Sequence, residues 1–87
     1  MKRLKLSPKK YVKLKQYVFY RDTCSCVICG LPHHLTPHHV INRAQGGADA
    51  PNNLVTLCVA CHDKVEQRKI DLPESVKETL ASEPLTL

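Results

Sequence analysis

Residues 54–62 read "LVTLCVACH" and combine three signals in nine positions. The leucine and β-branched residues of 54–58 predict a short strand. Cys58 and Cys61 then form a C-x₂-C knuckle, a spacing typical of cysteine ligands to zinc. His62 follows at once, and residues 59–69 contain neither Gly nor Pro, so we expect a helix there. The stretch therefore predicts a strand, a metal knuckle and a helix in direct succession.

A second knuckle, Cys26-Val-Ile-Cys29, lies upstream, with 28 residues between Cys29 and Cys58. Two such knuckles can bring four thiolates to one tetrahedral Zn²⁺, in a closed structural site that has no open coordination position. Gly30, directly after Cys29, suits the tight turn around a metal. A chance arrangement or a disulfide pair is the competing interpretation. We expect structural zinc on Cys26, Cys29, Cys58 and Cys61.

The fifth cysteine, Cys24, makes the choice of ligands less direct, because Cys24 and Cys29 could also be paired. A C-x-C spacing suits a thiolate turn less well than the C-x₂-C spacing of the knuckles. We therefore expect Cys24 to be a spare, half-buried thiol.

The composition also favours a metal. A chain of 87 residues with no Trp, one Phe and three Tyr makes one small domain, which buries only about 60–65% of its unfolded surface. Such a core needs additional stabilisation by a cross-link, either a disulfide or a bound metal. The odd number of cysteines, and an N-terminus "MKRLKLSPKK" without an apolar stretch, favour a reduced cytoplasmic protein with no membrane partner. We expect a monomer with a metal rather than disulfides.

Charge is distributed unevenly. Residues 1–21 contain eight basic residues and no acidic one, whereas the rest has five basic and eight acidic residues, so the +5 net charge comes from the N-terminal quarter. Clustered Lys and Arg bind polyanions by displacing condensed counterions. A solvated helix face is the simpler interpretation, and a polyanion-binding arm is the functional one. The basic residues are Lys2, Arg3, Lys5, Lys9, Lys10, Lys13, Lys15 and Arg21.

Ser7-Pro8 is typical of a helix start, with Ser as the cap and Pro at the first helical position. We expect a helix over residues 8–21. At helical spacing its sequence separates into two sides. The side expected to pack carries Tyr11, Leu14, Val18 and Arg21, and the side that presents charge carries Lys9, Lys13 and Gln16.

The remaining elements are predicted from the pattern of apolar residues and from the positions of Gly, Pro and Asn. We expect a short strand over 35–41, a loop over the Gly-, Pro- and Asn-rich residues 42–53, and a helix over 73–81 docked by Val76 and Leu80. The last six residues should fray. The chain is predicted to be one domain, 1–87, with an N-terminal arm and helix (1–21), a core (22–70) and a C-terminal helix and tail (71–87).

Two adjacent histidines, His38 and His39, lie on the first predicted strand. Successive strand side chains point to opposite faces, so the two should not both hold one ion. A hairpin of 35–41 with 54–58 would bring these positions to His62. Three converging histidines are not the usual core of a small domain.

Together these motifs resemble the HNH endonucleases of the ββα-metal (His-Me finger) fold, particularly the zinc-containing type common in phage genomes. The resemblance covers about half the chain, over "RDTCSCVICG…HHVINRAQGG…NNLVTLCVACHDKVEQ". It implies a small α+β domain with a structural zinc site of four cysteines and flanking N- and C-terminal helices. The family more often has Asp-His on the first strand, whereas this chain has His38-His39, as in the colicin nuclease domains.

Carried over by motif position, the resemblance implies a role for each site residue. His38 and His62 would hold one catalytic divalent ion (Mg²⁺, Mn²⁺, Ni²⁺ or Zn²⁺), His39 would be the general base, and Asn53 would brace the loop and the base. Neutral imidazole suits that base, since its ordinary pKa is about 6.5. Candidate DNA contacts are Lys9, Lys13, Arg21 and Arg43. His33 and His34 lie in a polar turn and are expected to be solvated.

The resemblance implies an enzyme that nicks or cuts DNA with low sequence specificity, because nothing in the chain resembles a base-reading helix. It also suggests work beside a phage DNA-packaging terminase, in the cytoplasm of the host cell. The competing function is a non-catalytic zinc module that binds DNA or a protein. An iron-type redox domain built on four cysteines is a third interpretation, and it leaves the histidines unexplained.

Overall fold

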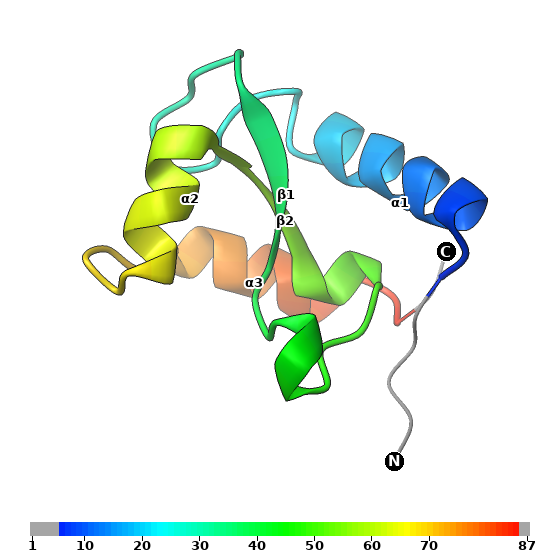
Figure 1. Ribbon diagram of the computed structural model, residues 1–87. Coiled ribbons are helices and arrows are strands. Elements are labelled where there is room, and N and C mark those ends of the chain that lie inside the picture. Colours follow the sequence, from blue (N-terminus) through cyan, green and yellow to red (C-terminus); the bar gives the residue numbers. More distant parts are fainter. Residues whose placement is uncertain (1–5, 86–87) are drawn as a thin grey trace.

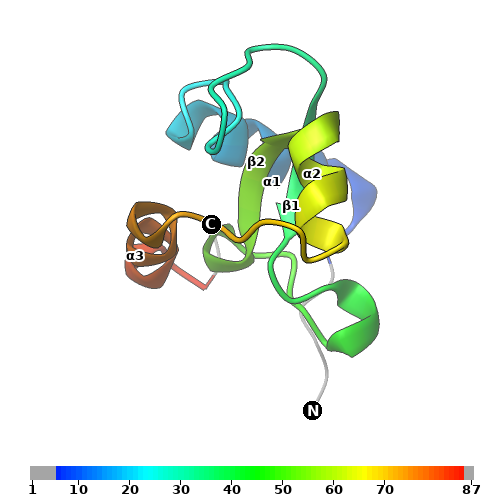
Figure 2. The same ribbon diagram turned by 90° about the vertical axis from the view of Figure 1, so that its left-hand side faces the viewer.

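A computed structural model describes residues 6–85 (Figure 1). A central β-hairpin lies between helix α1 on one side and helix α2 on the other, with α3 packed beside them (Figures 1 and 2). The predicted basic residues Lys2, Arg3 and Lys5 lie outside the described part of the chain. The elements are α1 (Pro8–Arg21), β1 (Leu35–His39), η1 (Arg43–Gln45), η2 (Pro51–Asn53), β2 (Leu54–Cys58), α2 (Val59–Glu66) and α3 (Glu74–Ser82).

Helix α1 has the predicted bounds and start. The Ser7 side chain accepts a hydrogen bond from Lys10 N, and Pro8 occupies the first turn, where its missing N–H is not needed. Leu14 and Val18 are fully buried and face β2 residue Leu54. Lys9, Lys13 and Gln16 are exposed, so the predicted division of the helix into a packed and a charged side is confirmed for these residues.

The two strands are antiparallel, and Leu35 pairs with Cys58 while His39 pairs with Leu54. This register places the start of β1 beside the second knuckle. β1 is two residues shorter than predicted, because Ile41 N donates to the Asn53 side chain instead of a strand partner. The strand alternation holds: the His38 ring lies against α2, while the His39 ring lies against α1.

Both faces of β2 are buried, which explains why residues 54–58 are apolar except for Thr56. On the α1 face, Leu54 packs with Leu14 and Val18. On the opposite face, Val55 and Leu57 pack with the buried cysteines and Leu72. The hairpin therefore separates two small hydrophobic cores and packs against both.

The glycines of the loop between the strands have different tasks. Gly46 has φ +85°, in the left-handed region that favours glycine. Gly47 instead allows close packing, because a Cβ there would overlap the Ile41 carbonyl. The loop itself contains two single turns of 3₁₀ helix, η1 and η2.

Helix α2 ends at Glu66, three residues before the predicted end. The chain leaves the helix there, and Arg68 takes φ +59°, which a continuing helix cannot contain. Helix α3 is shifted by one residue from the prediction. Val76 packs against the cysteine core and Leu80 is buried, so its predicted docking residues are confirmed.

Arg21 joins three elements from the inside of the protein. Its side chain is 11% exposed, and its guanidinium donates to Asp22 and Glu83 and to the carbonyls of Pro51 and Leu54. The expectation that the chain frays after residue 81 is thus wrong for Glu83. The prediction that Arg21 contacts DNA is not supported by this geometry, because its donors are directed at protein acceptors.

The predicted fold class is confirmed: a small α+β domain with a β-hairpin followed by a helix, a cluster of four cysteines, and flanking helices. Within residues 6–85, no helix combines the length and apolar character that crossing a bilayer requires.

The Arg21 network predicts a large loss of stability in Arg21→Met. Removing one partner of a buried ionic network leaves the other charges and carbonyls unpaired, which costs about 3 kcal/mol or more. Urea unfolding of the zinc-loaded protein would measure the change. Lys13→Met, on the exposed side of the same helix, is the matched control and should change stability by no more than about 0.5 kcal/mol; equal effects would contradict the structural role of Arg21.

Candidate metal centres and active site

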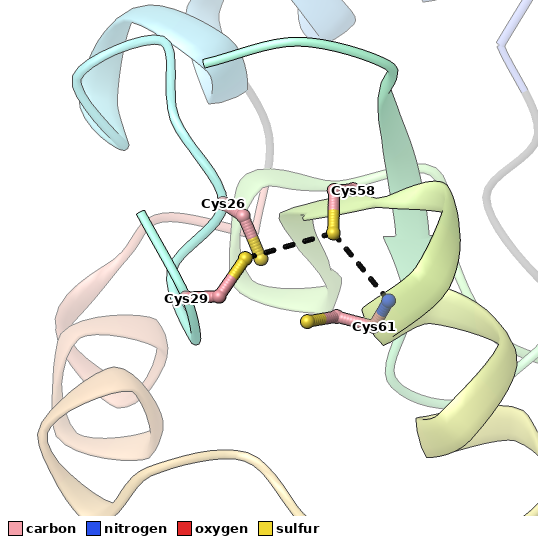
Figure 3. A group of neighbouring side chains, drawn as sticks. All are labelled: Cys26, Cys29, Cys58 and Cys61. Atoms are coloured by element: carbon pink, nitrogen blue, oxygen red, sulfur yellow. Dashed lines mark hydrogen bonds between the residues drawn. The ribbon is translucent and has the colours of Figure 1, made fainter. Parts of the chain in front are cut away.

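The four knuckle cysteines converge at one point, where the loop after α1 meets the end of β2 (Figure 3). One ligand atom from each of them lies within 4.8 Å of the others, and the Sγ atoms of Cys29 and Cys58 are 3.7 Å apart. The register of the hairpin and the first turn of α2 place the second knuckle, while a turn closed by Gly30 N and Cys26 O places the first.

Backbone N–H groups surround these sulfur atoms, as expected for thiolate ligands. Cys61 N donates to Cys58 Sγ at 3.4 Å. Burial raises the pKa of the Cys26 thiol, but N–H groups of Cys29, Cys58 and Ile28 outweigh it and lower that pKa to about 6. Burial and the neighbouring cysteines raise the pKa of Cys61 to about 12. Four thiolates therefore need a cation among them, and the residues fit a structural zinc.

Cys24 lies outside this cluster and is exposed, so the expectation of a half-buried thiol is wrong. Its backbone has φ +52°, in the tight turn that leads from α1 to the first knuckle. His33 and His34 are exposed, as predicted, and belong to neither group of potential metal ligands among the described residues.

A second group of potential ligands lies between β1 and α2 and consists of His38, His62 and Glu66. Glu66 Oε1 is 3.5 Å from His38 Nδ1 and 3.2 Å from His62 Nε2. Ligand atoms held about 2.0–2.2 Å from one ion are separated by about 3–3.5 Å. The three side chains are thus spaced as ligands of a single ion would be.

His38 carries the clearest sign of a missing partner. Its side chain is buried, and Nδ1 is the one buried side-chain nitrogen or oxygen without a hydrogen-bond partner in residues 6–85. Burial, together with neighbouring His62, lowers the pKa of His38, so that its imidazole is neutral at neutral pH. A neutral, buried, unpartnered nitrogen beside another imidazole and a carboxylate fits a divalent cation.

The orientation of His62 is set by Thr36. Thr36 Oγ1 lies 3.1 Å from Leu57 O and 2.7 Å from His62 Nδ1. A hydroxyl has one proton, and the Leu57 carbonyl can only accept it, so Oγ1 is the acceptor toward His62. His62 Nδ1 then carries the proton and Nε2 offers its lone pair beside Glu66, an arrangement typical of metal-binding histidines.

His39 is on the opposite face of the strand and takes no part in this group. Its Nε2 is 2.9 Å from Asp49 Oδ1, and its ring is stacked on Tyr11. The Asn53 side chain holds the loop between the two strands. Its Oδ1 accepts from Ile41 N, and its Nδ2 donates to the carbonyls of Ile41 and Ala48.

Comparison with known proteins agrees with this arrangement. Residues 26–68 match the family model described as HNH endonuclease. These residues form an HNH endonuclease domain. The chain is also 29% identical over 68 residues to a protein named Anaredoxin from Nostoc sp. (strain PCC 7120 / SAG 25.82 / UTEX 2576), and the match covers 75% of this chain and 90% of that protein.

In the HNH domain, residues of both histidine groups line a polar pocket of about 270 Å³. Its lining includes His38 and Glu66, from the group of potential ligands, and His39. Arg68 and Gln45 also line it. A ligand in this pocket would therefore lie beside both His38 and His39.

The predicted DNA contacts lie in different environments. Lys9 and Lys13 are exposed on α1. Arg43 is partly exposed, binds both carboxylate oxygens of Asp49, and has its guanidinium carbon 4.7 Å from the centre of the Tyr11 ring. Contact of these three residues with DNA stays a prediction.

Two functional candidates, Glu66 and Asp49, were not found from the sequence. For Glu66 a signal exists: it follows His62 by four residues, which places both on one face of a helix. Asp49 carries no such signal, because it lies in an irregular loop, and only folding brings it to His39.

Loss of the zinc site should unfold the protein. Metal binding of this kind contributes about 10 kcal/mol or more, which equals or exceeds the net stability of a small domain. We therefore expect Cys58→Ser to lose bound zinc and its cooperative thermal transition at neutral pH. Circular dichroism and atomic absorption would measure these, with the exposed Cys24→Ser as the control that keeps both. A native-like transition without zinc in Cys58→Ser would rule out the structural role.

Proposed function

We propose that this protein is a metal-dependent HNH endonuclease that hydrolyses DNA phosphodiester bonds, nicking or cutting with low sequence specificity. The observation that carries the proposal is the buried, unpartnered Nδ1 of His38 next to His62 and Glu66. On the other face of the same strand, His39 lines the pocket that His38 and Glu66 also line. Family membership supports DNA as the partner.

The residues divide into a group that binds cation and phosphate and a group that moves a proton. His38, His62 and Glu66 would hold one divalent ion, which when bound supplies Lewis acidity at the phosphate and at the leaving 3′ oxygen. His39 would take a proton from the attacking water as the water oxygen bonds to phosphorus and the bond to the 3′ oxygen breaks. The leaving oxygen is protonated by solvent.

Asn53 supports this proposal by its position. Its side chain ties Ile41, just after the histidine strand, to Ala48, just before Asp49. The loop that carries Asp49 is thereby held against the strand that carries His39. Lys9 and Lys13 are exposed on α1, whose buried side packs against the hairpin, and they are proposed to contact the DNA backbone.

The zinc at the four cysteines would be structural, since its four thiolate ligands leave no position for substrate. The competing non-catalytic DNA- or protein-binding module accounts for these cysteines and for the lysines. It does not account for the buried, unpartnered His38 nitrogen. A role beside a phage DNA-packaging terminase stays a prediction of the sequence resemblance.

The proposal predicts that His39→Ala loses cleavage and keeps DNA affinity. A positioned general base contributes about 10²–10⁴-fold, so plasmid nicking should fall by that factor. The assay would compare Mg²⁺, Mn²⁺, Ni²⁺ and Zn²⁺ after mild chelation that leaves the cysteine site loaded. Fluorescence anisotropy of labelled DNA would follow affinity.

His33→Ala is the matched control, because His33 is an exposed histidine outside both ligand groups. It should cleave like the wild type. DNA binding by the wild type with no cleavage in any of the four ions would favour the non-catalytic module and overturn the proposed activity.

The ligand assignment predicts that Glu66→Gln weakens Mn²⁺ binding. The amide keeps the shape but removes the negative charge, so we expect affinity to fall by at least about tenfold. Isothermal titration calorimetry of zinc-loaded protein would measure it. Glu78→Gln, an exposed position on α3, is the control. Equal Mn²⁺ affinity in wild type and Glu66→Gln would exclude Glu66 as a ligand.

A further inference from the structure

The histidine proposed as the base has a partner that its sequence position does not suggest. His39 Nε2 lies 2.9 Å from Asp49 Oδ1, and the His39 side chain is only 14% exposed. Tyr11 stacks on the ring, with centroids 6.3 Å apart and planes 10° apart. The ring is therefore fixed in orientation by one hydrogen bond at its edge and one aromatic contact on its face.

Asp49 is a fully buried carboxylate held by donors alone. Its side chain is 0% exposed. Oδ1 accepts from Arg43 Nε, and Oδ2 accepts from Arg43 Nη2 and Leu6 N. Burial raises the pKa of Asp49, but the hydrogen bonds from Arg43 and His39 outweigh burial and hold that pKa below its usual value. Asp49 is thus ionised at neutral pH and can only accept hydrogen bonds.

We infer that Asp49 is a positioning residue that holds His39 in the tautomer with its proton on Nε2 and its lone pair on Nδ1. The inference rests on the proposed nuclease function for its catalytic meaning. Because Asp49 only accepts, Nε2 has to be the donor. The lone pair that can receive a proton from water is then on Nδ1, and His39 is one of the residues that line the pocket with His38 and Glu66.

Arg43 stabilises the ionised carboxylate of Asp49. Its bidentate pair with Asp49 compensates the buried charge, so the carboxylate has no need to take the proton from His39. When His39 accepts a proton from water, the ring becomes a cation adjacent to a carboxylate, which stabilises it without a second proton transfer. Asp49 therefore orients the base and stabilises its charged form, while it touches neither water nor phosphate.

The test is Asp49→Asn, for which the hydrogen bonds predict a definite result. Asparagine has one acceptor oxygen, and at the Oδ2 position that oxygen satisfies both Arg43 Nη2 and Leu6 N. The amide group then faces His39 Nε2, which must become an acceptor, so the proton moves to Nδ1, and Arg43 Nε is the one donor left facing the amide. The opposite orientation would leave two donors, Arg43 Nη2 and Leu6 N, facing the amide.

Nitrogen-15 NMR of the histidine side chains reports the tautomer directly. The spectra would use zinc-loaded protein without added divalent ion, at a pH of about 8, where an ordinary imidazole is neutral. We expect the Nε2–H tautomer at His39 in the wild type and Nδ1–H in Asp49→Asn. Arg43→Gln, which removes both guanidinium donors and leaves the carboxylate in place, should keep Nε2–H. His39→Ala identifies the resonances.

Plasmid cleavage then measures the consequence. Asp49→Asn should lower the maximal rate by about 10²–10⁴-fold, as expected for a base in the wrong tautomer, with DNA affinity and KM unchanged within about threefold. An unchanged rate in Asp49→Asn beside an active wild type would overturn the inference and leave the proposed function standing. An Nδ1–H signal in the wild type would overturn it even where the variant fails to fold. An inactive wild type would overturn both the proposed function and the catalytic role of Asp49. The tautomer of His39 would then show only how Asp49 orients the ring.

Discussion

The antiparallel register of β1 and β2 is the constraint on which the other features depend. By pairing Leu35 with Cys58 it brings the start of the first strand to the second knuckle. By strand alternation it then directs His38 toward α2 and His39 toward α1. A slip by one residue would exchange these faces and separate His38 from His62. One geometric relation therefore positions the zinc knuckle, the cation ligands and the proposed base.

A hairpin of two five-residue strands cannot hold that register alone. Each face of β2 is covered by a small core, one with α1 and one with the cysteines. The buried guanidinium of Arg21 links α1, β2 and the segment after α3. A zinc ion held by the four cysteines would supply stabilisation that such small cores lack.

In both histidine groups, a neighbouring side chain fixes which imidazole nitrogen carries the proton. Thr36 accepts from His62 Nδ1 and leaves Nε2 for a cation. Asp49 accepts from His39 Nε2 and leaves Nδ1 as the proton acceptor in our inference. A histidine binds metal or accepts a proton only through a nitrogen without hydrogen. Control of the second nitrogen is thus a direct way to assign one function to each imidazole.

Local signals determined much of this protein before folding was considered. The C-x₂-C spacing predicted the four-cysteine cluster, Ser7-Pro8 predicted the start of α1, and 54–58 predicted β2. These are short-range patterns, in which the residue type and the conformation constrain each other directly. The ends of β1 and α2 were less well predicted, because loop hydrogen bonds and a left-handed residue decide them.

Only the tertiary structure decided what surrounds each charged group. Arg21, predicted to meet DNA, is buried among acceptors from three segments, and Asp49, in an irregular loop, lies against His39. Such contacts join residues that are distant in sequence or held in irregular loops, and their energy depends on burial and on the competing donors nearby. Residue type and spacing in the sequence reveal neither the burial of a group nor the donors that compete for it.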